Sequence, residues 1–197
     1  MDLIGKHTMV FGLKGAGKSN FTQWIIDDHD AYRNALVYDV CREHGNTEVA
    51  RYIPTHRSGK ESRAEFGAVI AKYVTENHRD ARPDLVVAEE VSRVAPNSGA
   101  TPDQLLDLID MNRHYNVGFL GVARRPAQVD ANLVELADNI IVFAVRGKND
   151  RKRLNNEAPG AGDAAAKMDK YHFLRITPDR RFEIHKPVPE KDSTGKL

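Results

Sequence analysis

The feature that most constrains this chain lies between residues 8 and 19, where a short apolar run leads into a glycine-rich loop. Met9, Val10 and Phe11 form the apolar run, and the next eight residues read Gly-Leu-Lys-Gly-Ala-Gly-Lys-Ser. This is the pattern G-x-x-x-x-G-K-S between a predicted strand and a predicted helix, the context in which the pattern indicates a phosphate-binding loop. Glycines let the backbone turn its N–H groups toward an anion, at dihedral angles that a Cβ penalises. The sequence therefore predicts a P-loop that binds a nucleoside triphosphate.

The residue types of this loop predict their roles around a triphosphate. The helix that begins near Lys18 directs the positive end of its dipole toward the phosphates. We expect the Lys18 ammonium to contact the β- and γ-phosphates and the Ser19 hydroxyl to hold Mg²⁺, so ATP and Mg²⁺ are the predicted cofactors. The predicted nucleotide-binding residues are Gly12, Leu13, Lys14, Gly15, Ala16, Gly17, Lys18, Ser19 and Asn20.

Apolar runs and helical patterns alternate along the rest of the chain. Strands are predicted at 35–38, 85–88, 117–123 and 140–145, and helices at 17–28, 62–74, 101–109 and 130–137. Residues 62–65 and 101–104 both read as capping boxes at helix starts. The polar segment 41–60 is predicted to be mostly loop, and 171–177 with 182–185 to form a terminal hairpin. This alternation predicts an α/β fold with right-handed crossovers and a mainly parallel sheet.

Bulk composition sets limits on function. The 197 residues suit one domain, which we place at 1–185, followed by a polar tail at 186–197. A net charge of +1 gives no overall attraction to nucleic acid, so any such binding depends on local patches. Cys41 is the only cysteine, and the eight histidines show no ligand-like pairing, so we expect neither an intrachain disulfide nor a structural metal. We expect no signal peptide and no membrane span.

Two acidic residues follow the predicted strand at 85–88. Ligands of parallel sheets bind at the carboxyl ends of the strands, which is where Glu89 and Glu90 lie in the sequence. We assign Glu89 to the metal, through water, and Glu90 to activation of the attacking water. Asp39, at the end of an earlier strand, is a weaker candidate for the same site. The alternative is that the two acids begin an ordinary charged loop.

Other classes of P-loop protein are distinguished by motifs that this sequence lacks. No N-K-x-D motif is present to read a guanine base, which argues against a GTPase, and no L-S-G-G-Q-type signature indicates a transporter ATPase. A small-molecule kinase remains possible because a basic cluster resembles an arginine-rich lid. That cluster comprises Arg146, Lys148, Arg151, Lys152 and Arg153.

A longer stretch carries a family resemblance. Residues 110–130 read Asp-Met-Asn-Arg-His-Tyr-Asn-Val-Gly-Phe-Leu-Gly-Val-Ala-Arg-Arg-Pro-Ala-Gln-Val-Asp. This resembles the FtsK–HerA superfamily of DNA-pumping ATPases, which place an arginine just before a strand and a Gln-Arg-Pro element after it. Residues 136–143 match the next helix-to-strand step, and the resemblance spans Lys6 to Asn155. The length is similar to that of the genome-packaging ATPases of membrane-containing double-jelly-roll viruses of bacteria and archaea.

The resemblance implies a fold and a set of roles. The fold would be a RecA/ASCE-like P-loop NTPase, a three-layer sandwich with a C-terminal antiparallel hairpin. Arg113 would be an arginine finger that reaches the γ-phosphate of the neighbouring subunit, with Arg146 as the reserve candidate. Arg124 stands where the family has a sensor glutamine, and because arginine can only donate hydrogen bonds it would contact phosphate but not position water. The predicted catalytic residues are Lys18, Glu90, Arg113 and Arg124, and the metal-binding residues are Ser19 and Glu89.

The function implied is an ATP-driven double-stranded DNA translocase that packages a viral genome. Such a protein would form a homo-oligomeric ring of five or six subunits, bind DNA without sequence preference, dock on a viral capsid or membrane vertex, and reside in the host cytoplasm or the virion. The alternatives are a nucleotide or small-molecule kinase and a nucleotide-switched module for phage assembly or export.

Three regions are candidates for DNA contact. They are the loop 92–100 and the basic groups at 57–63 and 151–153. The alternative for each basic group is an ordinary solvated face.

Overall fold

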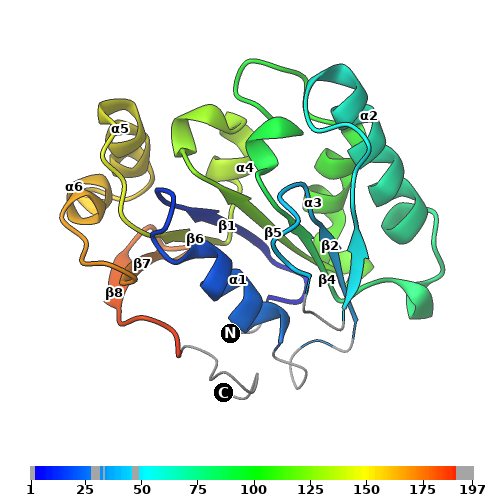
Figure 1. The fold of residues 1–197 in the computed structure, drawn as a ribbon, viewed down its shortest axis with the longest axis horizontal. Helices are drawn as coiled ribbons and strands as arrows, with labels where there is room; N and C mark the ends of the chain where they lie inside the picture. The colour runs from blue at the N-terminus through cyan, green and yellow to red at the C-terminus, as the bar shows by residue number, and fades with distance from the viewer. Residues whose placement is uncertain (1–2, 28–31, 33, 46–48, 190–197) are drawn as a thin grey trace.

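The computed structural model describes residues 3–27, 32, 34–45 and 49–189, and their strands form one sheet (Figure 1). The spatial order is β3-β2-β4-β5-β1-β6-β7-β8. The first six strands in that order are parallel, whereas β7 is antiparallel to β6 and β8 to β7. The strands are β1 (His7–Phe11), β2 (Ala35–Tyr38), β3 (Ala50–Tyr52), β4 (Leu85–Ala88), β5 (Gly118–Ala123), β6 (Asn139–Val142), β7 (Phe173–Ile176) and β8 (Phe182–His185). The predicted α/β fold with a mainly parallel sheet and a terminal antiparallel hairpin is confirmed.

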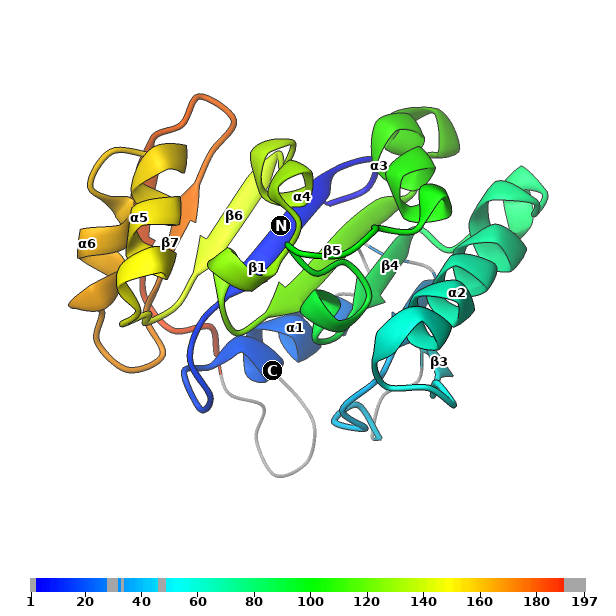
Figure 2. The same ribbon diagram turned by 90° about the horizontal axis from the view of Figure 1, so that it is seen from above.

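Helices cover both faces of the sheet, which gives three layers (Figure 2). The α-helices are α1 (Lys18–Ile26), α2 (Gly59–Ile70), α3 (Asp103–Tyr115), α4 (Ala131–Glu135), α5 (Lys148–Glu157) and α6 (Ala161–Ala166). In β1, Met9 and Phe11 belong to the core shared with α2 to α6, whereas Val10 packs in the core shared with α1. Because side chains alternate between the faces of a strand and both faces are covered, β1 is buried along its whole length.

Both capping boxes expected from the sequence are wrong. Helix α2 begins at Gly59, three residues before Ser62, which is buried inside the helix. The Glu65 carboxylate instead accepts hydrogen bonds from the backbone N–H groups of Thr55 and His56, both at 2.8 Å. This carboxylate therefore holds the chain that leads into α2 and does not cap the helix.

The second box fails for a different reason. Pro102 is the residue before α3, and the Thr101 hydroxyl donates to the Asp130 carboxylate. Asp130 is itself the N-cap of α4, where it accepts from the N–H of Asn132 at 2.9 Å. The Thr101 hydroxyl therefore makes a tertiary contact with the N-cap of α4 and does not cap α3.

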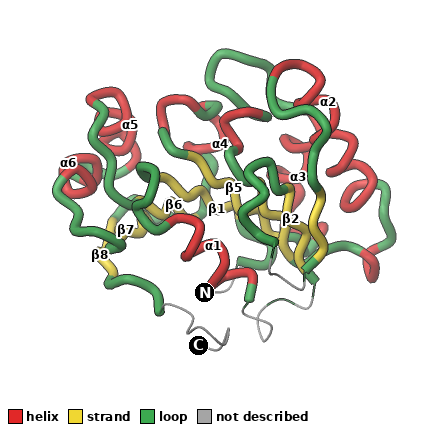
Figure 3. Tube along the Cα trace, viewed as in Figure 1, coloured by secondary structure: helices red, strands yellow, loops and turns green. Residues whose placement is uncertain are grey.

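The structure contains elements that the sequence patterns did not reveal. The segment 41–60 includes the short strand β3 at the sheet edge, where Tyr52 stacks on Tyr38 with ring centroids 5.6 Å apart. Helices α5 and α6 lie beside the β7–β8 hairpin (Figure 3). A three-residue edge strand shows too few alternations to be detected, and α5 is too polar for a clear apolar stripe.

Some expectations fall outside the described residues. The first helix was expected to reach Asp28, but α1 ends at Ile26 and residue 28 is not described. Residues 190–197 of the expected tail are likewise not described, whereas Val188 packs against the core on the α1 face. No helix in the described part of the chain is both long and apolar enough to cross a membrane.

His7 gives the fold a predictable pH dependence. The residue is buried, and burial lowers the pKa of its imidazole from 6.5 to about 3. Between these pH values the unfolded chain binds a proton that the native protein excludes, so stability falls as pH decreases through this window. We expect His7 to reduce the free energy of unfolding by about 2 kcal/mol at pH 5 relative to pH 7. Urea unfolding of the wild type and of His7→Leu at both pH values measures this, and an equal pH dependence in the two proteins would contradict it.

Candidate functional site

The sheet order brings five strand ends together at one edge. β2, β4, β5, β1 and β6 are consecutive and parallel, so the residues that follow them lie along the same edge. β5 lies between β1, which leads into the P-loop, and β4, which Glu89 and Glu90 follow. The residues immediately after these strands include Asp39, Glu89, Arg124, Gly12 and Phe143. Crevices outside the carboxyl ends of such strands are where α/β proteins bind ligands.

The P-loop has the backbone conformation that its glycines allow. Gly17 immediately precedes α1 and has φ 115°, a value that residues with a Cβ rarely adopt. A Cβ at Gly12 would lie 2.6 Å from the Phe143 Cβ, so a larger residue would force the loop away from β6. The loop therefore turns tightly between β1 and α1, with the N-terminus of α1 directed to the place where an anion would bind.

Lys18 lies within this turn. Its ammonium donates hydrogen bonds to the backbone carbonyls of Gly12 at 2.9 Å and Leu13 at 3.1 Å. Burial lowers the pKa of Lys18, while the negative charges of Glu90 and then Glu89 act in the opposite direction. Both carboxylates thus lie close enough to Lys18 to interact with its charge.

Ser19, the predicted metal ligand, contacts an acid that sequence reasoning missed. The Ser19 hydroxyl donates to Glu43 Oε2 at 2.6 Å. The turn that carries Glu43 is held by the buried carboxylate of Asp39, which accepts from the N–H of Glu43 at 3.0 Å and of His44 at 3.2 Å. Arg51 of β3 pairs with the same carboxylate at 3.3 Å. Asp39 therefore supports the site by positioning Glu43 and His44.

His44 connects the P-loop helix to the first acid. This buried imidazole lies 2.8 Å from Glu89 Oε1 through Nε2 and 3.0 Å from Gln23 Oε1 through Nδ1. Burial lowers the pKa of His44, but the hydrogen bond to Glu89 and the charges of Glu89, Asp39 and Glu43 outweigh it, and the net pKa is raised. His44 fixes the orientation of Glu89. The one sequence signal for Glu43 and His44 was their place after the strand that ends at Tyr38.

Glu90 and Arg124 form the second acidic contact of the site. Glu90 has φ 49°, which turns the chain out of β4 and directs its side chain differently from that of Glu89. Glu90 Oε2 lies 3.1 Å from Arg124 Nε, and Ser92 donates to the other oxygen at 3.3 Å. Arg124 thus contacts the proposed base directly, a pairing that the sequence did not predict.

The side chains here have the chemistry that Mg²⁺ prefers. The described residues contain no group of three or more His, Cys, Asp or Glu side chains that could hold a metal by themselves. Mg²⁺ in nucleotide sites, however, needs only one or two protein oxygens, because water and phosphates supply the rest. The Ser19 hydroxyl and the carboxylates of Glu43 and Glu89 are hard oxygen donors, and they lie at the same edge of the sheet as the P-loop. These residues therefore fit the ion.

A cavity beside the P-loop is suited to a nucleobase. It has a volume of about 320 Å³, and its lining includes Leu13 and Ala16 of the loop. Met168 and Tyr171 also line it, and the Lys170 ammonium lies 4.6 Å from the Tyr171 ring centroid. An apolar slot next to an aromatic ring can accept a planar base by stacking. Arg146 also lines this cavity, at the same edge as the P-loop.

Arg113 lies at the opposite edge of the sheet from the P-loop. It belongs to the last turn of α3, next to the amino ends of the strands, and its side chain is 81% exposed. The five residues of β1 lie between the two edges, and the strand is about 13 Å long from its first Cα to its last, four steps of about 3.3 Å each. Arg113 therefore cannot contact a phosphate in its own P-loop.

Two of the candidate DNA regions meet in space. Arg93, in the loop 92–100, donates to the Arg57 carbonyl at 3.1 Å. A Cβ built on Gly99 would lie 3.8 Å from the Arg63 guanidinium. We call the surface formed by 57–63 and 92–100 the basic loop surface. The third region, 151–153, differs because Arg151 pairs with Asp163 and Arg153 donates to the Ala131 carbonyl.

Comparison with known proteins identifies solved structures that share the fold. No family model and no curated protein matches the chain. The DNA-packaging ATPase B204 from Sulfolobus turreted icosahedral virus aligns with a TM-score of 0.77 at 15% identity, over 95% of this chain and 100% of that chain. The genome packaging NTPase B204 from Sulfolobus turreted icosahedral virus 2, in complex with AMPPCP, aligns with a TM-score of 0.73 at 16% identity, over 94% and 98%.

A second kind of protein shares the fold. The N-terminal domain of zonular occludens toxin from Neisseria meningitidis has a TM-score of 0.57 at 16% identity, over 94% of this chain and 95% of that chain. At these identities the likeness concerns the fold. The resemblance to packaging ATPases that the sequence suggested is thereby confirmed at the level of fold.

Proposed function

We propose that this chain is an ATP-driven double-stranded DNA translocase of the FtsK–HerA type that packages a viral genome. The observation that carries the proposal is the convergence of Lys18, Glu89 and Glu90 at one sheet edge. The likeness in fold to packaging ATPases solved with nucleotide analogues supports it.

The chain's own residues divide the chemistry between them. The P-loop N–H groups and Lys18 bind the phosphates, and the cavity at Tyr171 takes the base. Ser19, Glu43 and Glu89 would hold Mg²⁺, which neutralises charge on the phosphates when bound. Glu90 accepts a proton from the attacking water, with Arg124 orienting its carboxylate.

Hydrolysis would be completed between subunits. Because Arg113 lies at the edge opposite its own P-loop, we propose that it reaches the γ-phosphate bound by a neighbouring copy. A head-to-tail interface of this kind closes into a ring, for which five or six subunits are expected. Docking on a capsid or membrane vertex and residence in the virion belong to the same proposal.

DNA would contact the basic loop surface without reading its sequence. The proposal predicts ATPase activity that DNA of any sequence stimulates and that weakens steeply with salt, since each phosphate contact releases counterions. Replacing the exposed Arg57 with alanine should reduce the slope of log affinity against log salt by about 1. Lys72→Ala should not, because this exposed residue lies in the π-helical turn Ala71–Thr75, which continues α2 at the end away from that surface. Titrations of ATPase activity with DNA at several salt concentrations measure both. Activity indifferent to DNA would contradict translocation.

The alternatives make different predictions in the same assay. A small-molecule kinase would transfer the phosphoryl group to a small acceptor regardless of DNA. The arginine-rich lid that such a kinase would need is disfavoured, because Arg151 is held against α6 and Arg153 against α4. A nucleotide-switched assembly or export module would bind ATP without stimulation by DNA.

A further inference from the structure

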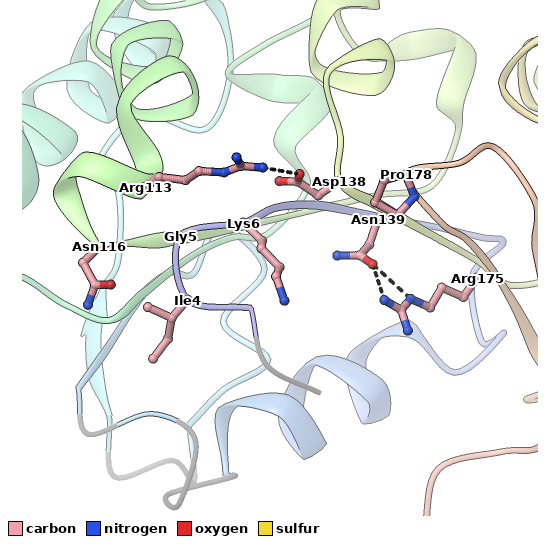
Figure 4. Close-up of a pocket in the computed structure, with 9 residues that line it drawn as sticks. All are labelled: Ile4, Gly5, Lys6, Arg113, Asn116, Asp138, Asn139, Arg175 and Pro178. Carbon is pink, nitrogen blue, oxygen red and sulfur yellow. Dashed lines mark hydrogen bonds and ion pairs between the residues drawn. The ribbon is translucent and has the colours of Figure 1, made fainter.

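A polar cavity of about 440 Å³ lies at the amino ends of β1 and β6, on the edge opposite the P-loop (Figure 4). Its charged lining residues are Lys6, Arg113, Arg175 and Asp138. In Figure 4, Arg113 and Arg175 enter from opposite sides and Lys6 lies between them. Two guanidinium groups, those of Arg113 and Arg175, line the cavity with one carboxylate, and this balance favours an anionic ligand.

The single carboxylate is already engaged by the backbone. Asp138 Oδ2 accepts from the N–H of His7 at 2.8 Å, and its Oδ1 lies 3.7 Å from Arg113 Nη2. The second distance is too long for a hydrogen bond, so Asp138 guides Arg113 without immobilising it. The exposed Arg113 guanidinium can therefore turn to another anion.

Arg175 is held in place more firmly. Its Nε and Nη2 both donate to Asn139 Oδ1, at 2.9 and 2.7 Å. Asn139 is buried, and its amide nitrogen lies 3.4 Å from the Thr8 hydroxyl, which fixes the acceptor. The partner is a neutral amide, so the Arg175 charge is oriented but not neutralised. Such preorganised charge suits electrostatic stabilisation of a reacting phosphate.

We propose that Arg175 contacts the triphosphate held in the P-loop of a second copy of this chain, beside Arg113. This inference rests on the proposed function, and it adds a second cation to the subunit boundary. The anion must come from another molecule, because β1 separates the cavity from the chain's own P-loop by about 13 Å.

The role of Arg175 is electrostatic. During hydrolysis the oxygen of water bonds to the γ-phosphorus while the bond to the β–γ bridging oxygen breaks, giving ADP, inorganic phosphate and a proton. Negative charge that develops on the transferred group and the bridging oxygen is stabilised by guanidinium donors. Arg113 supplies an adjustable donor and Arg175 a fixed one.

The test uses the full chain and the substitution Arg175→Gln, which keeps a donor for Asn139 and removes the charge. We expect kcat for ATP, without DNA, to fall about 10²-fold, the effect of losing one preorganised donor. Affinity for ATP should fall much less than kcat, because the P-loop holds the ground-state triphosphate and Arg175 acts mainly on charge that develops in the transition state. Arg181→Ala is the matched control on the same hairpin, with a side chain 86% exposed, and it should retain wild-type turnover.

Mixing tests whether Arg175 acts on a second copy. An Arg175→Gln subunit has an intact P-loop, and a Lys18→Ala subunit has an intact cavity, so mixtures should recover turnover that neither variant shows alone. Lack of recovery would overturn the inference, as would a loss confined to DNA-stimulated activity, which would assign Arg175 to the DNA backbone. Wild-type turnover by Arg175→Gln overturns this inference alone. Absence of ATP hydrolysis by the wild type overturns the proposed function as well.

Discussion

Replacing Lys18 with alanine is expected to abolish ATP turnover and weaken nucleotide binding. In the structure the Lys18 ammonium bonds to the carbonyls of Gly12 and Leu13, inside the turn where phosphates would bind. Hydrogen bonds to charged groups contribute about 1.5–3 kcal/mol each, so ATP affinity should fall about 10- to 100-fold. Turnover should fall further, by at least about 10²-fold, because the ammonium also stabilises charge that develops on the reacting phosphate.

The measurements are equilibrium titration with a fluorescent ATP analogue and steady-state phosphate release. Lys72→Ala removes an exposed lysine whose ammonium lies over the Tyr73 ring, far from the P-loop, and should behave as the wild type. Thermal unfolding of both variants checks that the fold is retained. Normal ATPase activity of Lys18→Ala would refute the assignment of the P-loop as the nucleotide site.

Mixing Arg113→Ala subunits with Glu90→Gln subunits is expected to restore ATP hydrolysis that each variant has lost. Removal of an arginine finger costs about 10³- to 10⁵-fold in rate, and Glu90→Gln removes the proposed base while leaving ATP bound. At a mixed boundary, the Arg113→Ala subunit supplies an intact Glu90 and its neighbour supplies an intact Arg113. That boundary has every catalytic group.

The geometry excludes the alternative that each arginine serves its own nucleotide. The P-loop and Arg113 lie at opposite ends of β1, so each variant alone should be inactive and only the mixture active. The control mixes Lys18→Ala subunits with a chain that carries both Arg113→Ala and Glu90→Gln. No boundary in that mixture combines Lys18, Glu90 and the neighbour's Arg113, so no activity should return. No recovery in the first mixture would exclude a finger in trans and favour Arg146, which lies beside the P-loop.

Local chemistry explains which site residues were predictable from sequence. The P-loop could be recognised because its glycines, Lys18 and Ser19 act through neighbouring backbone and are contiguous in the chain. Glu89 and Glu90 could be recognised because they follow a buried apolar strand. Glu43 and His44 could not, since they lie in a polar segment without periodicity and gain their role only when Asp39 folds the turn against α1 and β4.

The sequence by itself determined the alternation of strands and helices, the triphosphate loop and the two acids, because these depend on contacts within a few residues. Only the tertiary structure decided which strands are neighbours, and therefore that β5 separates β1 from β4. It also decided that Arg113 and Arg175, 62 positions apart by numbering, line one cavity at the edge away from the P-loop. The physical reason is that parallel strands carry residues distant in sequence to a common edge, and no local pattern records the order in which they pair.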